Sequence, residues 1–230
     1  MNPITKLIAG GPSRKSRLHS ESGNLMPWKE LRHLPRVAME FTQSRLFGVR
    51  PPVPWWPVSV IPIIEEFLKA QPRDVIEFGS GSSTIWLAER AKAVNSIEDS
   101  KKWAETTNKR LKERSISTAT VRHAEGSDYY DLGLISQQSF DLAIIDGSWR
   151  WRCVESVLPL MKPSSLIYLD NSDADKDRHH YSSTTMSKEA QKRLVRYSEA
   201  HPGSRIEVVH SLISGELHSG EGMLLWLNRD

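Results

Sequence analysis

From residue 58 onward, the chain alternates between segments with a helical pattern and short strand-like segments, and this alternation constrains the fold more than any other feature. Five strand-like segments cover residues 74–79, 93–97, 118–121, 140–146 and 166–170, and two more are expected near 206–213 and 223–227. Helices are expected at 58–68, 85–91, 100–114 and 151–161, and one more ends at about Ala200. Strands that alternate with helices form a parallel sheet covered on both faces. We therefore predict an α/β fold with a seven-stranded, mostly parallel sheet, helices on both faces and a C-terminal antiparallel β-hairpin.

Residues 1–55 differ in composition from the rest of the chain. Ten of the thirteen prolines lie in the first 72 residues, and residues 1–50 hold nine Lys or Arg against three Glu. This segment therefore carries a charge of +6 and the remainder −3, so the overall +3 arises at the N-terminus. We predict a basic, proline-containing arm over residues 1–55, with disorder in 1–25, one or two short helices up to Phe47, and a single domain over 56–230. A solvated flexible arm explains these charges, and so does an arm that contacts nucleic acid, anionic lipid or an acidic partner.

The composition also limits the class and location of the protein. Hydrophobic residues make up 38% and charged residues 26% of the chain, which is typical of a globular protein. The longest uncharged apolar stretch, Pro51–Ile64, is interrupted by prolines and too short to span a bilayer, so no membrane span is expected. The N-terminus lacks the apolar core of a secretory signal. The single cysteine, Cys153, excludes an internal disulfide and a cysteine-clustered zinc site, and we expect a cytoplasmic protein.

A glycine-containing loop follows the first strand and is the strongest candidate for a binding site. In an open α/β sheet, ligands bind outside the carboxyl ends of the strands. Gly79 and Gly81 permit a tight turn and a close approach of a ligand to the backbone. A dinucleotide-binding loop would have a third glycine at the position of Thr84, and the Glu77 carboxylate disfavours a pyrophosphate at this point. The loop therefore favours a ligand with a cationic or amino group.

The second strand ends in another acidic residue, Glu98, which lies 19 residues after Gly79. An acidic side chain ~20 residues after the first glycine contacts ribose hydroxyls in dinucleotide-binding folds. An acidic residue at this distance, together with a loop that suits phosphate poorly, indicates a nucleoside ligand without a pyrophosphate.

The sequence Glu77-x-Gly79-x-Gly81 followed by Glu98 resembles the class I S-adenosylmethionine-dependent methyltransferases, over roughly residues 58–227. The resemblance implies a Rossmann-like fold and S-adenosylmethionine as the cofactor. It implies that Gly79 and Gly81 lie under the methionine portion of the cofactor, that the surroundings of Glu77 hold this portion, and that Glu98 binds the ribose.

The same resemblance extends to other positions of the chain. Ser83 stands where the family has a third glycine, and Ala124 and Glu125 follow the third strand, where the family contacts adenine. The cofactor-binding residues that the resemblance implies are Glu77, Gly79, Ser80, Gly81, Ser82, Ser83, Thr84, Glu98, Ala124, Glu125 and Asp146.

Polar side chains also follow the fourth and fifth strands. Asp146 ends the fourth strand, and Asp170 and Asn171 end the fifth, so these oxygens meet at one rim of a parallel sheet and could hold Mg²⁺. The set resembles that of the cation-dependent O-methyltransferases, in which a metal orients and acidifies a substrate hydroxyl. Catechol-type members have a lysine where this chain has Trp149, so a lysine base is absent. Asp146 fits a metal-free methyltransferase equally, with Asp170 and Asn171 only starting a turn.

Two further residues are candidates for catalysis. Arg150 follows Asp146 closely and would suit a carboxylate, phosphate or sugar-acid acceptor. The polar loop over residues 171–185 could cover the acceptor, with His179 or His180 as a general base, although a solvated pair of histidines explains the same residues. The predicted catalytic residues are therefore Asp146, Arg150 and His179.

These observations favour a methyltransferase that transfers a methyl group to a hydroxyl of a small metabolite or saccharide. An RNA or other polymer methyltransferase recruited by the basic arm remains an alternative, as do aminopropyl transfer on the same fold and a non-catalytic nucleoside-binding protein. The sequence does not predict an oligomeric state.

Overall fold

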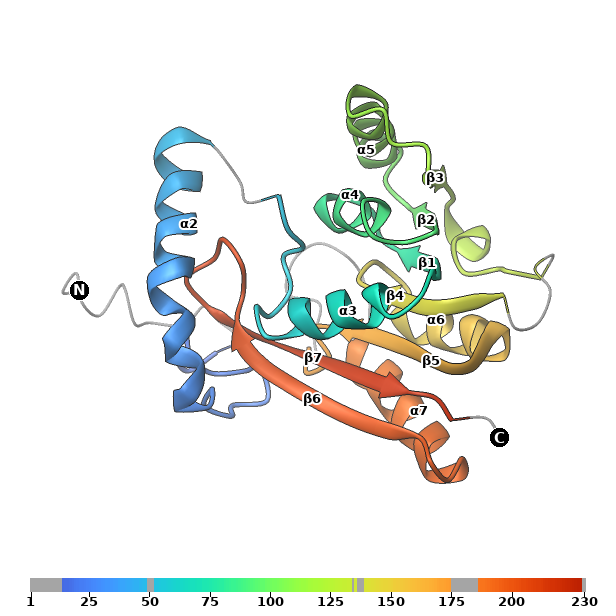
Figure 1. Cartoon of the computed structure of the whole chain (residues 1–230). Helices are drawn as coiled ribbons and strands as arrows, with labels where there is room; N and C mark the ends of the chain where they lie inside the picture. Colours follow the sequence, from blue (N-terminus) through green and yellow to red (C-terminus); the bar gives the residue numbers. More distant parts are fainter. Residues whose placement is uncertain (1–13, 49–51, 134, 136–138, 175–185, 229–230) are drawn as a thin grey trace.

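The computed structural model describes residues 14–48, 52–133, 135, 139–174 and 186–228. Its seven strands are β1 (Asp74–Phe78), β2 (Ala93–Glu98), β3 (Ala119–His123), β4 (Phe140–Ile145), β5 (Met161–Asp170), β6 (Arg205–Leu212) and β7 (Ser219–Trp226). They form one sheet in the order β3-β2-β1-β4-β5-β7-β6 (Figure 1). The first five strands pair in parallel, and β7 pairs antiparallel with both β5 and β6. The predicted mostly parallel sheet with a C-terminal antiparallel hairpin is confirmed.

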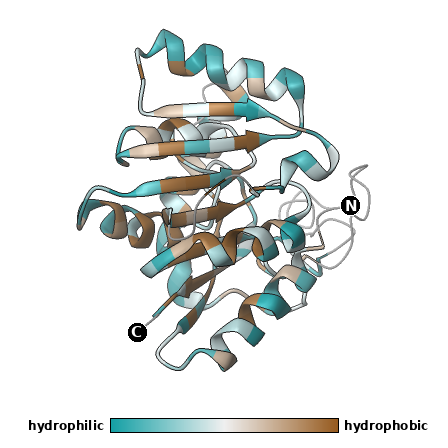
Figure 2. Ribbon diagram, turned by 90° about the vertical axis from the view of Figure 1, so that its right-hand side faces the viewer, coloured by the Kyte–Doolittle hydropathy of each residue, from teal (hydrophilic) through white to brown (hydrophobic). Residues whose placement is uncertain are grey.

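The helices cover both faces of this sheet. They are η1 (Trp28–His33), α2 (Leu34–Phe47), α3 (Val60–Lys69), α4 (Ser82–Ala88), α5 (Lys101–Glu113), η2 (Gly126–Tyr129), α6 (Arg150–Val157), η3 (Leu158–Leu160) and α7 (Ser187–Ala200), where η marks a 3-10 helix. One hydrophobic cluster packs α3, α4 and α5 against the sheet, and a second packs α6 and α7 against the opposite face. Side chains alternate along each strand, so Val75 enters the first cluster and Ile76 the second. Figure 2 shows the hydrophobic residues concentrated along the central strands.

Two details differ from the sequence analysis. The α-helix expected at residues 151–161 ends at Val157 and gives way to the 3-10 helix η3, because Pro159 has no N–H to continue the α-helical hydrogen bonds. The strand expected at 166–170 therefore begins earlier, at Met161. Between β3 and β4, the described residues contain only the short η2, so helix and strand do not alternate there.

The described part of the N-terminal segment packs against the β6–β7 hairpin. Two buried glutamates make these contacts: Glu30 accepts hydrogen bonds from Ser59 Oγ at 2.5 Å and Ser211 Oγ at 2.6 Å, and Glu40 accepts one from Ser214 Oγ at 2.9 Å. The short helices expected before residue 47 are present as η1 and α2.

The start of the described chain is also placed on this hairpin. Disorder was expected over residues 1–25, of which the structure describes 14–25. Within that part, Arg17 O accepts from Ser219 N at 2.7 Å and Glu21 N donates to Asp173 Oδ2 at 2.5 Å. Backbone pairing of this kind is not visible as periodicity in a polar, glycine-containing segment. The division of the chain after residue 55 stays a prediction. No described helix is both long and apolar enough to cross a membrane.

Candidate functional site

The loop after β1 is built around the carboxylate of Glu77, which is fully buried at the end of the strand. Ser83 Oγ donates to Glu77 Oε1 and Thr84 Oγ1 donates to Glu77 Oε2, both at 2.6 Å. Thr84 Oγ1 also accepts from Gly81 N at 2.9 Å, which satisfies a free donor at the start of α4. Burial raises the pKa of Glu77 to about 7, although the two hydroxyl bonds favour the charged form. Glu77 therefore fixes the shape of the loop from beneath.

Glu98 joins the same loop from the end of β2. Its Oε2 accepts from Ser80 N at 2.7 Å and from Ser80 Oγ at 3.0 Å, while its Oε1 accepts from Ser100 N at 3.0 Å. Burial raises the pKa of Glu98, and the bonds from Ser100 and Ser80 oppose this shift. The structure thus brings together the glycine loop and the predicted ribose-binding carboxylate. Ser82 begins α4 beside them.

A side chain at position 79 would collide with the backbone of Gly147, a contact that the sequence did not predict. The φ of Gly79 is +94°, which lies in the left-handed region that favours glycine. A Cβ on Gly79 would lie 2.9 Å from Gly147 N, and a Cβ on Gly147 would lie 2.0 Å from the hydroxyl of Tyr129. The loops after β1 and β4 therefore meet backbone to backbone, with Tyr129 of η2 buried beneath them. The Tyr129 hydroxyl is buried and has no hydrogen-bond partner among the described residues.

The aromatic ring of Trp103 lies over the outer side of the glycine loop. Trp103 Nε1 donates to Ser80 O, and a Cβ on Gly81 would lie 3.4 Å from the same nitrogen. Trp103 is 42% exposed, so it does not lie in the core. Because α5 carries Trp103 on the side that faces α4, this ring shields the loop instead.

The two residues expected near adenine are held differently. Ala124 is buried and its N donates to Glu98 O at 2.9 Å, which fixes the end of β3 beside β2. The Glu125 carboxylate is exposed and lies 3.1 Å from His123 Nε2. His123 is itself exposed.

The part of the site at the ends of β4 and β5 is organised by Arg150, which is 6% exposed. Its Nε donates to Gly147 O at 2.9 Å. Its Nη1 donates to Asp170 O and to Ser187 Oγ, and its Nη2 donates to Asp146 O at 3.1 Å and to Asp146 Oδ1 at 3.4 Å. A guanidinium has five N–H donors, and all five are used here. Arg150 therefore ties together the ends of β4 and β5 and the start of α7, and no donor is left for an anionic acceptor.

Asp146 and Asp170 are close neighbours at this point. Asp146 Oδ2 accepts from Trp56 Nε1 at 3.0 Å, and Asp170 Oδ1 accepts from the Tyr168 hydroxyl at 2.5 Å. Burial and the neighbouring Asp146 carboxylate raise the pKa of Asp170 well above its ordinary value, against the influence of Arg150. Asp170 is buried, whereas the Asp146 side chain is 30% exposed. Asp146 is thus the carboxylate of the pair that a ligand can reach.

These contacts do not fit a Mg²⁺ ion. Both Asp146 oxygens accept N–H bonds, and Arg150 supplies the positive charge beside them. Asn171 starts a turn with φ +44°, and its backbone oxygen accepts from Ala174 N. In the described part of the chain, no group of three or more His, Cys, Asp or Glu side chains could hold a metal. A magnesium site at Asp146, Asp170 and Asn171 stays a prediction of the sequence, and His179 lies outside the described residues.

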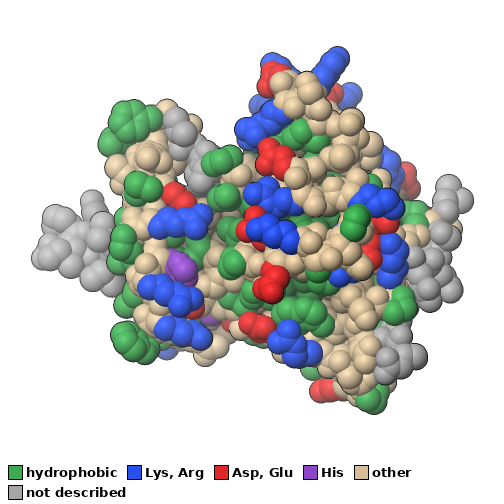
Figure 3. All heavy atoms as spheres, in the orientation of Figure 1, with side chains coloured by type: hydrophobic (Ala, Val, Ile, Leu, Met, Phe, Trp, Pro, Cys, Tyr) green, Lys and Arg blue, Asp and Glu red, His purple; other side chains and the backbone are tan. Residues whose placement is uncertain are grey.

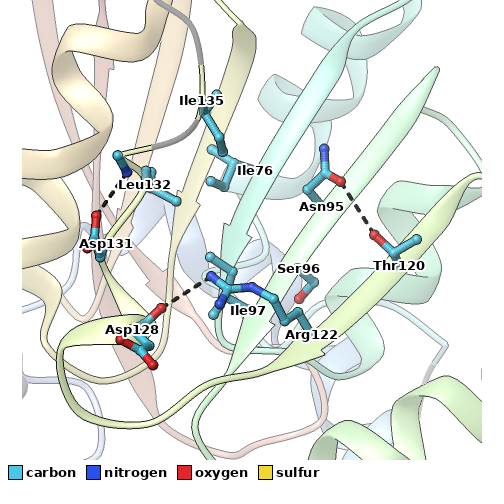
Figure 4. Close-up of a pocket in the computed structure, with 11 residues that line it drawn as sticks. Ile76, Asn95, Ser96, Ile97, Thr120, Arg122, Asp128, Asp131, Leu132 and Ile135 are labelled. Carbon is cyan, nitrogen blue, oxygen red and sulfur yellow. Dashed lines mark hydrogen bonds between the residues drawn. The ribbon is translucent and has the colours of Figure 1, made fainter.

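A pocket of about 730 Å³ lies elsewhere, on the face of the sheet over β1, β2 and β3. Figure 4 shows Arg122 reaching toward the backbone of Asp128 at its edge, and Asn95 bonded to Thr120. None of the predicted site residues lines this pocket. This part of the sheet is left open because the described residues between β3 and β4 form only the short η2.

Several contacts of the site lie outside the sequence prediction. Trp56 lies 90 positions before Asp146 in the sequence, and Tyr168 sits inside an apolar strand. Gly147 directly follows Asp146, and this Asp-Gly pair was the one local signal that could have drawn attention to it.

Comparison with solved structures places this arrangement among known folds, whereas no family model and no curated protein matches the chain. An O-methyltransferase from Bacillus cereus in complex with SAH superimposes with a TM-score of 0.59, at 19% identity over 84% of this chain and 98% of that chain. The O-methyltransferase TomG from Streptomyces achromogenes gives 0.57, at 17% identity over 84% and 89%. The cofactor-bound protein Rv0187 from MTB gives 0.58, at 21% identity over 84% and 97%. Together with the strand order and the loop after β1, these matches show that the chain has the class I S-adenosylmethionine-dependent methyltransferase fold.

Proposed function

We propose that this protein is an S-adenosylmethionine-dependent methyltransferase that acts on a hydroxyl group of a small metabolite or saccharide. The observation that carries the proposal is the attachment of Ser80, in the glycine loop, to Glu98 at the end of β2. This attachment sets a carboxylate beside a loop whose backbone a ligand can approach closely. The O-methyltransferases among the structures of the same fold support a hydroxyl acceptor.

The residues of the loop fit this cofactor. Gly79 and Gly81 would lie along its methionine portion, Glu98 would bind the ribose, and Ala124 would contact the adenine. The carboxylate of Glu98 suits the ribose, because carboxylate oxygens accept hydrogen bonds from hydroxyls. The buried Tyr129 hydroxyl next to the same loop, which finds no partner in the described part of the chain, adds an unused polar group at this end of the site.

The chemistry requires little from the protein beyond position and one proton acceptor. When bound, S-adenosylmethionine supplies an activated methyl group. Asp146 would accept the proton of the acceptor hydroxyl, because it is the reachable carboxylate at the ends of β4 and β5. Burial and the neighbouring Asp146 raise the pKa of Asp170, which disfavours its charged form. Arg150 and Trp56 hold the Asp146 side chain in one orientation from two sides.

The use of Arg150 also bears on the acceptor class. The sequence alone suggested that Arg150 could bind a carboxylate, phosphate or sugar acid. All five of its donors are used within the protein, so an anionic acceptor would have to displace existing bonds. A neutral hydroxyl compound needs no such displacement.

Calorimetric titration with S-adenosylmethionine tests the cofactor. We expect micromolar binding to the wild type and a loss of about tenfold or more in Glu98→Ala, since a hydrogen bond to a charged group contributes about 1.5–3 kcal/mol. Glu105→Ala, an exposed glutamate on the neighbouring α5, is the matched control and should bind as the wild type does. The same titration in buffer with Mg²⁺ and in buffer with EDTA tests whether cofactor binding depends on the metal. Absence of binding in both buffers would overturn the proposal.

A second assay tests the acceptor chemistry. Asp146→Asn should retain cofactor binding while methyl transfer to a panel of hydroxylated metabolites and sugars falls by about 100-fold or more, because general acid–base groups contribute at least this much. Equal transfer by the variant and the wild type would exclude Asp146 as the proton acceptor. Methyl transfer to RNA but to no member of the panel would show that the acceptor is a polymer and not a small molecule.

A further inference from the structure

Exposed large hydrophobic side chains are concentrated in one short part of the molecule. Of the twelve among the described residues, seven lie within residues 25–47: Leu25, Trp28, Leu31, Leu34, Met39, Leu46 and Phe47. Trp28 is 85% exposed and Phe47 73%. Single exposed hydrophobic residues are ordinary, but a group of this size marks an interaction surface. We call residues 25–47 the N-terminal face.

The helix α2 has two apolar sides, of which the protein uses one. Val37 and Glu40 are buried against the hairpin side, where Val37 joins Met26 in a small cluster. Pro35, Met39 and Leu46 recur at i, i+4 and i+11, which brings them within ~40° of one another on the opposite side. All three are exposed. Figure 1 shows α2 standing beside the hairpin, away from the rest of the sheet.

The exposed Lys, Arg, Asp and Glu side chains of the N-terminal face are all basic. Four basic residues lie on it, namely Lys29, Arg32, Arg36 and Arg45, and all are exposed. Its two glutamates, Glu30 and Glu40, are buried at 5% and 8% exposure and bond to the hairpin. Of the four cations, Arg36 is paired with Glu40 at 2.8 Å. Figure 3 shows basic and hydrophobic side chains next to one another over this part of the molecule.

We propose that the N-terminal face binds the surface of a membrane that contains anionic lipid. Segments that lie at a membrane surface combine apolar side chains such as Trp, Phe, Leu and Met with Lys and Arg. The apolar side chains enter the headgroup region, and the cations pair with lipid phosphates. A second copy of the chain is a poorer occupant, since two such faces would bring like charges together without an exposed carboxylate to pair them. RNA would engage the cations but leave the aliphatic side chains in water.

Flotation of the full-length protein with lipid vesicles tests the proposal. The probes are vesicles of pure phosphatidylcholine and vesicles in which about 30% is replaced by phosphatidylglycerol. We expect binding to the anionic vesicles that exceeds binding to the neutral ones by about tenfold or more and falls as salt is added. Equal or absent binding to the two vesicles would overturn the proposal.

Two sets of substitutions separate the apolar and the charged contributions. The triple variant Trp28→Ser, Met39→Ser, Leu46→Ser should lower the partition coefficient by about tenfold or more, because these side chains would no longer enter the lipid. The triple variant Lys29→Gln, Arg32→Gln, Arg45→Gln should do the same at low salt. Substitution of exposed residues leaves the fold intact, which circular dichroism checks.

Matched controls come from elsewhere on the surface. Val208→Ser removes an exposed apolar residue of β6, and Lys102→Gln, Lys109→Gln, Lys112→Gln removes three lysines of α5. Both should bind the anionic vesicles as the wild type does. If these controls lose binding to the same extent, the interaction is a non-specific charge effect and the proposal fails. It also fails if sedimentation shows a dimer that only the serine variant dissociates, because the face then joins two copies.

Discussion

The two ends of the candidate site are built in different ways. The end that we propose for the cofactor joins residues that lie close in the chain: Glu77, Ser80, Ser83 and Glu98 belong to β1, β2, the loop after β1 and the first turn of α4. The end that we propose for the acceptor joins Trp56 to Asp146 and Arg150 to Ser187, so it draws on segments far apart in the chain. The first end is therefore a local motif, and the second exists only once the whole sheet has formed.

This difference predicts which property a substitution at each end of the site will change. A local motif depends on its own loop, so a substitution there affects binding of one ligand. The acceptor end depends on Arg150, a single buried cation on which three elements converge. Substitutions at the two ends should therefore separate cofactor binding from stability and transfer.

The largest effect is expected for Arg150→Met, which tests whether the acceptor end depends on one residue. The variant leaves the Asp146 carboxylate without its cation and the backbone oxygens of Asp146, Gly147 and Asp170 without their donor, and loss of a buried charged partner costs about 3–5 kcal/mol. Urea unfolding measures this loss. Arg150→Lys should recover only part of it, because an ammonium cannot reach five acceptors. A variant as stable as the wild type would contradict the central role given to Arg150.

The next largest effect is a pH dependence of the free energy of unfolding, which we expect to arise from Glu77. In the folded protein the pKa of Glu77 is about 7, above the ordinary value of 4.5. Because the folded state binds the proton more tightly, the stability that Glu77 contributes is present below pH 4.5 and is lost as pH rises through 7. The loss amounts to at most about 3 kcal/mol.

Urea unfolding at pH 5 and pH 8 checks this expectation. The fall in the free energy of unfolding between the two should be smaller in Glu77→Gln than in the wild type. The comparison of the two proteins is needed because Asp170, whose pKa is also raised, contributes in the same direction to both. An equal fall in both proteins would show that Glu77 does not titrate in this range.

A smaller effect is expected where the two ends touch. Gly147→Ala places a methyl group against the Tyr129 hydroxyl and the backbone of Gly79, and overpacking of this kind costs about 1–3 kcal/mol. Tyr129→Phe removes the hydroxyl, which bonds to no described residue, and should be close to neutral. The double variant should then recover part of the loss. Strictly additive effects would mean that the clash lies with Gly79 alone.

The smallest effect is expected for Tyr168→Phe, which removes one hydrogen bond to Asp170 without changing the packing. The free energy of unfolding should fall by about 0.5–1.5 kcal/mol. Cofactor affinity, measured by calorimetry, should be unchanged while methyl transfer falls. A parallel loss of cofactor affinity would show that the two ends are coupled more closely than their contacts indicate.

The same contrast explains what could be predicted from sequence. The strand and helix pattern depends on neighbouring residues, so the sheet and its hairpin were predicted, apart from the start of β5, where Pro159 was given too little weight. The grouping of Glu77, Gly79 and Glu98 was predictable because it follows from the order of two strands.

The acceptor end was less predictable for a physical reason. Sequence placed Arg150 near Asp146 but could not show that its donors would be used by Asp170 and Ser187, because these contacts depend on the packing of α7. The role of Trp56 depends equally on a contact over 90 positions of the chain. Such pairings leave no periodic signal.

The buried glutamates of the N-terminal segment bear on how the chain is made. Glu30 and Glu40 bond to Ser211 and Ser214, which lie 181 and 174 positions later. A ribosome releases η1 and α2 long before it makes the hairpin, so these two carboxylates lack their serine partners until β6 and the turn after it have been made. Docking of η1 and α2 therefore has to follow the synthesis of β6, and a chain truncated before β6 would leave Glu30 and Glu40 without these serine partners.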